Sequence, residues 1–276
     1  MLVFINPPIP RLNHLPVSSL TGETSQKKDA CFSVGPEPGF PSHNHIAGHE
    51  GIGNIVASYD KSLLGRPVAM RYLGYACQSC RYCRLGTYES CPDQKAFPKH
   101  HSGCFQQYMT VPWSSLLPLP EWVFDAKDGF NPAAYTGALC SGSAALKAAK
   151  AANIRPRDTV VVVGAMGGIG HLVGQMAKHV FGAKVVGVDL AVKVEATSSE
   201  DHSYYCDRLL PSPTSVDDPR SWDEFQERLR ETYVELNGDD SEFLGADSVI
   251  VTASSASAFN RLDTYVRDGG SIICVG

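Results

Sequence analysis

The feature that constrains the fold most is a run of four consecutive valines, Val160–Val163, which leads directly into the glycine-rich segment Gly164–Gly170. An unbroken β-branched run bounded by glycine is typical of a strand that is buried on both faces of a parallel sheet. The following chain continues as predicted strands over 184–188, 247–252 and 271–275 and predicted helices over 169–181 and 256–266. Alternation of strands and helices predicts an α/β fold with a doubly wound parallel sheet.

The segment Gly164–Gly170 has the composition of a turn that binds a dinucleotide. A pyrophosphate needs backbone N–H groups at a helix N-terminus, and glycines allow it to approach the backbone closely. The strict Gly-x-Gly-x-x-Gly pattern would place glycine at position 165, which is Ala165, so this turn is a variant. The residues expected to contact the cofactor are Gly164, Gly167, Gly168, Ile169 and Gly170.

An acidic residue, Asp189, ends the next predicted strand, 19 residues after Gly170. A carboxylate in that position can accept hydrogen bonds from the ribose hydroxyls of adenosine, and it would repel a 2′-phosphate. NAD(H) is therefore favoured over NADP(H), although Asp189 could also simply begin a loop. Lys193 is close enough in sequence to approach the same ribose, and a solvated lysine is the simpler interpretation.

Four cysteines, Cys77, Cys80, Cys83 and Cys91, fall within 15 residues. Spacers of two residues allow thiolates to converge on one tetrahedral zinc ion, and a site with four thiolates has no position left for water or substrate. The cluster therefore predicts a structural zinc, and four unrelated buried cysteines are the weaker alternative. A nucleic-acid-binding zinc ribbon is disfavoured because the arginines around the cluster are few.

The chain before residue 130 has a different character from the chain after it. Residues 1–45 contain seven prolines and are expected to be irregular. From about residue 46 to 120, short apolar runs alternate with glycine, proline and cysteine, which predicts small antiparallel β-structure with long loops. A β-rich module is therefore expected to precede the α/β module, with the boundary between residues 130 and 140.

Two further motifs make the pattern specific: Gly48-His49-Glu50-Gly51 before the cysteine cluster, and Cys140 within Ala138-Leu-Cys-Ser-Gly142 after it. Together with the cysteine cluster, the segment 103–108 and the glycine turn, they resemble the zinc-dependent alcohol dehydrogenases of the medium-chain dehydrogenase/reductase superfamily, most closely the yeast type. The resemblance extends over roughly residues 46–190 and 246–276.

This resemblance implies an incomplete GroES-like β-barrel domain over residues 1–135 and a Rossmann domain over 136–276 that lacks its last strand, with the active site in the cleft between them. It implies that the four-cysteine cluster binds structural zinc. It also implies a catalytic zinc bound by His49 and Cys140, with Glu50 as an intermittent ligand or a neighbouring carboxylate. Val275 would contact the nicotinamide.

The sequence departs from the family pattern where the first catalytic cysteine ligand is expected. Residues 21–29 contain no cysteine, and the candidate in that region is Cys31, 18 residues before His49, in a context that does not fit the motif. The hydroxyl of the proton relay normally follows that cysteine, so it has no assigned counterpart here. We expect the chain to be truncated or divergent at both ends.

These residues predict a zinc-dependent oxidoreductase that transfers a hydride between NAD(H) and an alcohol, aldehyde or ketone. One alternative is a non-catalytic relative that keeps a structural zinc and nucleotide binding. Another is a zinc-independent reductase of the same superfamily, which the retention of His49 and Cys140 disfavours.

The composition indicates which classes of partner and which cellular compartment to expect. The 276 residues include 24 Lys+Arg and 29 Asp+Glu, a formal net charge of −5, which argues against a nucleic-acid partner. No apolar run approaches the length that spans a bilayer, so no membrane partner is expected. The odd count of nine cysteines favours reduced thiols and a cytoplasmic location. The family resemblance adds a small alcohol or carbonyl substrate and assembly as a homo-oligomer.

Overall fold

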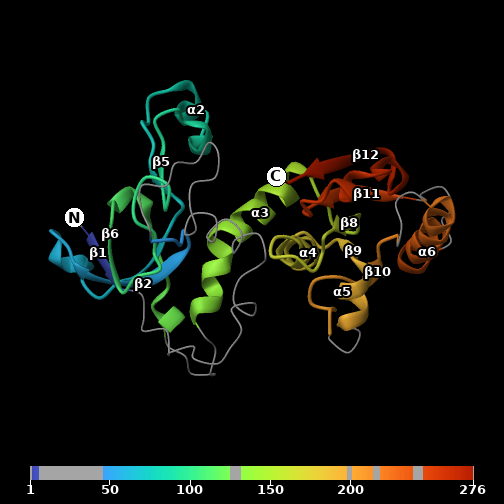
Figure 1. Ribbon diagram of the computed structural model, residues 1–276, viewed down its shortest axis with the longest axis horizontal. Helices are drawn as coiled ribbons and strands as arrows, with labels where there is room; N and C mark the ends of the chain where they lie inside the picture. Colours follow the sequence, from blue (N-terminus) through green and yellow to red (C-terminus); the bar gives the residue numbers. More distant parts are fainter. Residues whose placement is uncertain are drawn as a thin grey trace. The chain divides into compact units, whose positions relative to one another are not determined.

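The computed structural model describes residues 2–5, 46–124, 132–197, 201–213, 218–238 and 245–275. The chain divides into two compact units, Met1–Cys140 and Ser141–Gly276, and each unit has its own sheet (Figure 1). Cys31 and residues 21–29 lie outside the described residues. Within the described residues, none of the helices has the length and apolar composition that crossing a membrane requires.

The first unit is built on a five-stranded antiparallel sheet with the order β6-β1-β2-β3-β7. Its strands are β1 (Leu2–Ile5), β2 (Gly51–Ala57), β3 (Pro67–Met70), β6 (Tyr108–Val111) and β7 (Leu116–Pro118). In β6 the side chains alternate, with Met109 and Val111 buried, so one face of the strand supplies the core. The 3-10 turn η2 (Lys61–Leu63) lies between β2 and β3, and η4 (Trp113–Ser115) lies between β6 and β7. Two further 3-10 turns, η5 (Glu121–Phe124) and η6 (Pro132–Thr136), follow β7.

The structure corrects the expectation that residues 1–45 are irregular throughout. Residues Leu2–Ile5 form β1, which pairs with both β2 and β6 and therefore lies inside the sheet. The physical reason is that these four apolar, largely β-forming residues precede the first proline, Pro7. The remaining residues of that expectation, 6–45, lie outside the described residues.

The cysteine-rich segment forms a separate small lobe of the first unit. It lies between β4 (Leu73–Tyr75) and β5 (Lys95–Ala96), which pair with each other, and contains α2 (Arg81–Arg84) and η3 (Tyr88–Ser90). The buried residues of its core are Ala76, Cys83 and Cys91 alone, with Leu73, Cys77 and Cys80 packed against them. So small an apolar core needs a further source of stability.

The second unit contains a five-stranded parallel sheet with the order β10-β9-β8-β11-β12, as the valine run predicts. Its strands are β8 (Thr159–Val163), β9 (Lys184–Asp189), β10 (Arg208–Pro211), β11 (Ala246–Val251) and β12 (Val266–Cys274). Its helices are α3 (Ser143–Ala151), α4 (Gly170–His179), α5 (Ala191–Ala196) and α6 (Pro219–Asn237), and the π-helical turn η7 (Ala138–Gly142) precedes α3.

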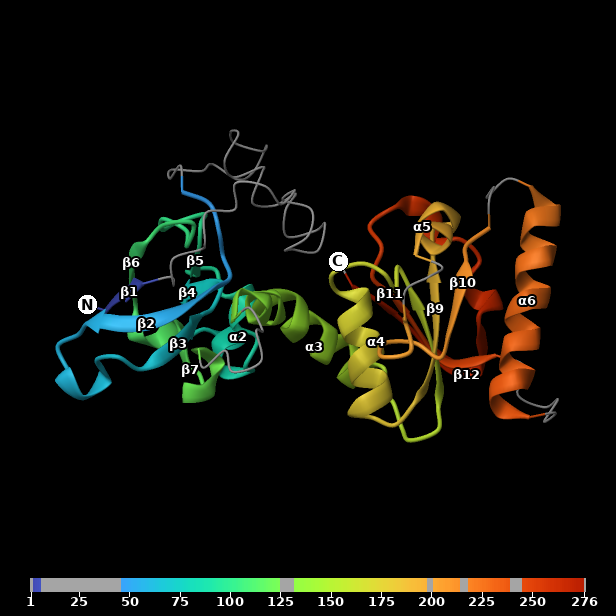
Figure 2. The same ribbon diagram turned by 90° about the horizontal axis from the view of Figure 1, so that it is seen from below.

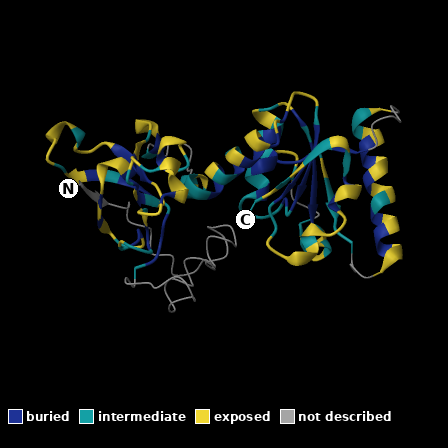
Figure 3. Ribbon diagram, turned by 90° about the horizontal axis from the view of Figure 1, so that it is seen from above, coloured by how far each residue is buried: buried dark blue, intermediate teal, exposed yellow. Residues whose placement is uncertain are grey.

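Both faces of this sheet are covered, because alternate valines of β8 point into two different cores. Val160 and Val162 pack with residues of α3 and α4, whereas Val161 and Val163 pack with residues of α6. Figure 2 shows α4 and α6 on opposite sides of the strands, and Figure 3 shows that the strands between them are largely buried. The sheet is therefore doubly wound, and the predicted Rossmann-type α/β fold is confirmed.

The helix predicted over residues 256–266 is wrong. The structure has two 3-10 turns there, η8 (Ala256–Phe259) and η9 (Leu262–Thr264). Arg261 between them has a left-handed backbone with φ of 50°, a conformation that a continuous α-helix does not contain. The strand that follows begins at Val266, earlier than predicted.

Candidate functional site

The four cysteine sulfurs of the small lobe converge, all lying within 4.8 Å of one another. The Sγ atoms of Cys77 and Cys83 are 3.9 Å apart, and tetrahedral zinc with Zn–S bonds of about 2.3 Å separates its sulfurs by about 3.8 Å. Backbone N–H groups point at the sulfurs, as from Cys80 to Cys77 Sγ at 3.3 Å and from Cys83 to Cys80 Sγ at 3.5 Å. The arrangement fits a closed four-thiolate zinc site.

The protonation of two of these thiols is already perturbed by the protein. Hydrogen bonds from the backbone and side chain of Ser79, followed by those from Cys80, lower the pKa of the Cys77 thiol to about 6. Burial and the neighbouring sulfurs raise the pKa of the Cys83 thiol to about 12. A bound cation would offset the cost of a buried thiolate at Cys83, since metal ligation requires the deprotonated form.

A second group of potential ligands consists of His49, Glu50 and Cys140, whose ligand atoms also lie within 4.8 Å of one another. His49 and Glu50 directly precede β2, and Cys140 lies in η7. The backbone N–H of Cys140 donates to Glu50 Oε1 at 2.8 Å, which joins segments that are 90 residues apart. His49 is buried and the other two are half-buried.

This donor set fits zinc of the catalytic type. An imidazole nitrogen, a carboxylate oxygen and a thiolate are all zinc ligands, and catalytic sites use three protein ligands with a fourth position for water or substrate. The structure therefore brings together the three residues that the motifs singled out. Cys31, the remaining candidate ligand, lies outside the described residues.

Sequence reasoning missed Tyr72, which follows β3 and lies beside this group. Its ring meets the His49 ring edge-on, with centroids 5.8 Å apart and an interplanar angle of 88°. Burial, and to a lesser extent the electrostatic interaction with Cys140, raises the pKa of the Tyr72 phenol. A single tyrosine after a strand carries no sequence signal that it will lie beside His49, and only the fold places it there.

The glycine turn between β8 and α4 has the close contacts that only glycine allows. Gly164 has φ of +83°, a region that favours glycine. A Cβ atom at Gly170 would lie 2.0 Å from the carbonyl oxygen of Gly164, and one at Gly167 would lie 3.2 Å from the same oxygen. Gly168 and Ile169 complete the turn, and Ile169 caps α4 without a side-chain hydrogen bond to the helix. Because no side chain caps this helix N-terminus, its backbone N–H groups can bind an anion.

Asp189 at the end of β9 is bound to this turn. Its Oδ2 atom accepts a hydrogen bond from the backbone N–H of Met166 at 2.8 Å, and its Oδ1 atom accepts one from Leu190 at 2.8 Å. The Nζ atom of Lys193 is 3.8 Å from Oδ1. The carboxylate is largely buried, and each oxygen of a carboxylate can accept more than one hydrogen bond.

Val275 follows β12, and its N–H donates to the carbonyl of Val251 at the end of β11 at 2.9 Å. Carboxyl ends of parallel strands share one edge of a sheet, and ligands of such folds bind at that edge. Thr252, which was not predicted, also lies there, and its hydroxyl donates to the carbonyls of Val163 and Gly164. The predicted cofactor residues of this unit therefore gather at one sheet edge.

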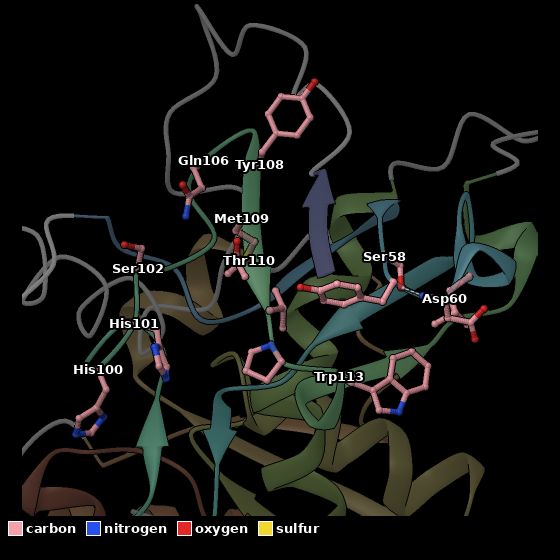
Figure 4. Close-up of a pocket in the computed structure, with 14 residues that line it drawn as sticks. Ser58, Asp60, His100, His101, Ser102, Gln106, Tyr108, Met109, Thr110 and Trp113 are labelled. Atoms are coloured by element: carbon pink, nitrogen blue, oxygen red, sulfur yellow. Dashed lines mark hydrogen bonds between the residues drawn. The ribbon is translucent and has the colours of Figure 1, made fainter. Parts of the chain in front are cut away.

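A groove of about 1220 Å³ lies elsewhere in the first unit, beside β6. Figure 4 shows His101, Tyr108 and Trp113 among its lining residues. None of the predicted ligand or cofactor residues lines it. The groove is therefore separate from the candidate site.

Comparisons with known proteins show which sequences and structures this chain is similar to. Residues 21–121 match the family described as the alcohol dehydrogenase GroES-like domain. The chain is 30% identical over 243 residues to alcohol dehydrogenase 2 of Emericella nidulans, covering 86% of the chain and 61% of that relative. It is 30% identical over 234 residues to alcohol dehydrogenase 1 of the same organism, covering 84% of the chain and 60% of that relative.

Among solved structures, alcohol dehydrogenase TADH from Thermus sp. ATN1 matches with a TM-score of 0.62 and 22% identity, covering 85% of this chain and 62% of that one. This likeness concerns the fold. The chain spans 61% and 60% of the lengths of its two curated relatives. The family resemblance stated from the motifs is confirmed by these matches.

Proposed function

We propose that this chain is a zinc-dependent oxidoreductase of the alcohol dehydrogenase family, because residues 21–121 match the GroES-like domain of that family and the chain is 30% identical to a curated alcohol dehydrogenase. It would transfer a hydride between NAD(H) and an alcohol, aldehyde or ketone. The observation that carries the proposal is the convergence of His49, Glu50 and Cys140 within 4.8 Å. Zinc bound there would act as a Lewis acid that polarises the substrate oxygen.

Each residue of this group has its own part in the proposal. His49 and Cys140 would hold the metal, and His49 is buried. Glu50 would act as an intermittent ligand, because its carboxylate already accepts the N–H of Cys140. Cys77, Cys80, Cys83 and Cys91 would hold the second, structural zinc. The catalytic and structural roles thus fall on separate groups of side chains.

The second unit would bind NAD(H) at the edge where its parallel strands end. The N–H groups of the turn Gly164–Gly170 and of the α4 N-terminus would receive the pyrophosphate. Asp189, with Lys193 beside it, would bind the adenosine ribose, and Val275 would contact the nicotinamide. Hydride transfer then depends on how the protein orients the cofactor and the substrate.

The proposal extends to the partner and the compartment. The substrate would be a small alcohol or carbonyl compound. The proposed compartment is the cytoplasm, because the odd count of nine cysteines favours reduced thiols. Assembly as a homo-oligomer stays a prediction from the family resemblance.

Replacing Cys140 by alanine tests the catalytic site. We expect the variant to lose at least about 100-fold in kcat/KM, since loss of a zinc ligand should exceed the 10–100-fold typical of groups that only support one. It should also retain one zinc per chain instead of two. NADH oxidation is followed with a panel of aldehydes and ketones, and zinc is measured by mass spectrometry. Cys206→Ala is the control, a buried thiol in the other unit. A wild-type protein inactive on the whole panel would contradict the proposal.

Replacing Asp189 by alanine tests cofactor choice. Hydrogen bonds to a charged group contribute about 1.5–3 kcal/mol, so NADH should bind about 10–100-fold more weakly while NADPH binding stays equal or improves. Calorimetry measures both affinities. Asp207→Ala is the matched control, because Asp207 also accepts a backbone N–H, from Val185, away from this edge. Equal losses of affinity for NADH and NADPH would show that Asp189 does not distinguish the free ribose hydroxyls from a 2′-phosphate.

A further inference from the structure

Cys104 is a buried cysteine that belongs to neither ligand group, and it contacts the segment that carries His49 and Glu50. Its backbone N–H donates to the carbonyl of Gly48 at 3.0 Å. Its Sγ donates to the carbonyl of Glu50 at 3.3 Å. The two acceptors are the carbonyls on either side of His49. One residue therefore holds the backbone before and after this histidine.

The neighbours of Cys104 extend this attachment along both segments. Gly103 N–H donates to the carbonyl of Ile46 at 2.8 Å, and Phe105 N–H donates to the carbonyl of Ala47 at 3.0 Å. The two backbones run so close that a Cβ at Gly103 would lie 2.2 Å from the carbonyl oxygen of Ala47. The segment 103–105 therefore cannot shift without moving residues 46–50.

The thiol itself is packed against this backbone. Cys104 is 1% exposed, and a Cβ at Gly48, where φ is +96°, would lie 2.7 Å from Cys104 Sγ. Glycine at position 48 thus leaves the space that the sulfur fills. A buried thiol suits this position because it is small, largely apolar and still a weak donor.

We propose that Cys104 is a positioning residue for the candidate catalytic site, an inference that rests on the function proposed above. Its amide and thiol fix the two carbonyls that flank His49. They thereby direct the imidazole of His49 and the carboxylate of Glu50 toward Cys140. Cys104 acts through these residues, since its own sulfur is not among the three converging ligand atoms. Partners that orient metal ligands typically affect metal affinity by 10–100-fold.

The experiment compares Cys104→Ala, which removes the donor, with Cys104→Ser, which keeps a hydroxyl donor. Cys206→Ala is the matched control, because Cys206 is also buried and its Sγ also contacts a carbonyl, that of His202, in the other unit. Hydrogen exchange of the peptide 46–52 reports how often its backbone hydrogen bonds open. Cobalt substitution reports on the metal site. The visible spectrum of a Cys140→Ala protein, which keeps only the four-cysteine site, is subtracted from each spectrum, and the remaining signal is titrated to give the cobalt affinity of the His49–Glu50–Cys140 site.

We expect exchange in residues 46–52 to accelerate at least about 10-fold in Cys104→Ala, and cobalt affinity at the second site to fall about 10–100-fold. Cys104→Ser should restore both to within about 3-fold of wild type, and Cys206→Ala should change neither. Unchanged exchange in Cys104→Ala, or an equal change in Cys206→Ala, would overturn the proposal. Wild-type protein that binds a single cobalt ion would count against the proposed function, and the exchange result would then decide the role of Cys104 alone.

Discussion

A Cys91→Ala substitution is expected to release zinc from the four-cysteine lobe and to unfold residues 76–94. The lobe has very few buried apolar residues, so the metal must supply most of its stability. At a free zinc concentration about 1,000 times Kd, binding stabilises the folded state by about 4.1 kcal/mol. Most of that contribution should disappear with one thiolate removed. Zinc content and the urea midpoint of the first unit measure the effect.

The control for this substitution is again Cys206→Ala, since both thiols are almost completely buried. Burial raises the pKa of Cys206 to about 12, and Cys206 belongs to neither group of converging ligand atoms, so it has no partners with which to bind a metal. Cys206→Ala should lower stability through the lost packing but keep both zinc ions. A Cys91→Ala protein with full zinc content would show that the cysteines are not a metal site.

A Gly170→Ala substitution is expected to weaken NADH binding by about 10–100-fold. The added Cβ would lie 2.0 Å from the carbonyl oxygen of Gly164 and 2.9 Å from the Cα of Ala165, both backbone atoms that cannot rotate away. Overpacking of this kind costs about 1–3 kcal/mol and moves the backbone. The α4 N-terminus would therefore shift away from the turn that binds the pyrophosphate. Calorimetry with NADH measures the loss.

Gly137→Ala is the matched control for Gly170→Ala, because a Cβ there meets no atom within 4 Å. It should bind NADH as the wild type does, and circular dichroism should show both variants folded. A folded Gly170→Ala protein with wild-type NADH affinity would contradict the assignment of this turn.

The second unit was largely predictable because its signals are local. Four adjacent valines require burial on both faces, and the structure divides them between two cores. The helical spacing of Trp222, Phe225, Leu229 and Tyr233 likewise matches the buried face of α6. The wrong prediction of a helix over residues 256–266 also has a local cause. Arg261 has a left-handed backbone there, and no glycine at that position signals it in the sequence.

The candidate catalytic site could not be assembled from local patterns. Glu50 and Cys140 are joined by a hydrogen bond across 90 residues, and neither periodicity nor spacing relates them. Family motifs identified both residues, but they said nothing of Tyr72 or Cys104, whose contacts depend on tertiary packing. The division between the two compact units falls after Cys140, within the π-helical turn that carries this cysteine.

The central claim is hydride transfer between NAD(H) and a carbonyl compound, and the most direct measurement follows the hydride itself. The purified chain, loaded with zinc, is incubated with an aldehyde and NADH that carries deuterium at nicotinamide C4, with each face labelled in a separate sample. Mass spectrometry of the product should find the alcohol carrying deuterium from one of the two samples, in amounts equal to the NADH consumed. No alcohol, or alcohol without deuterium from either sample across the aldehyde panel, would contradict the account.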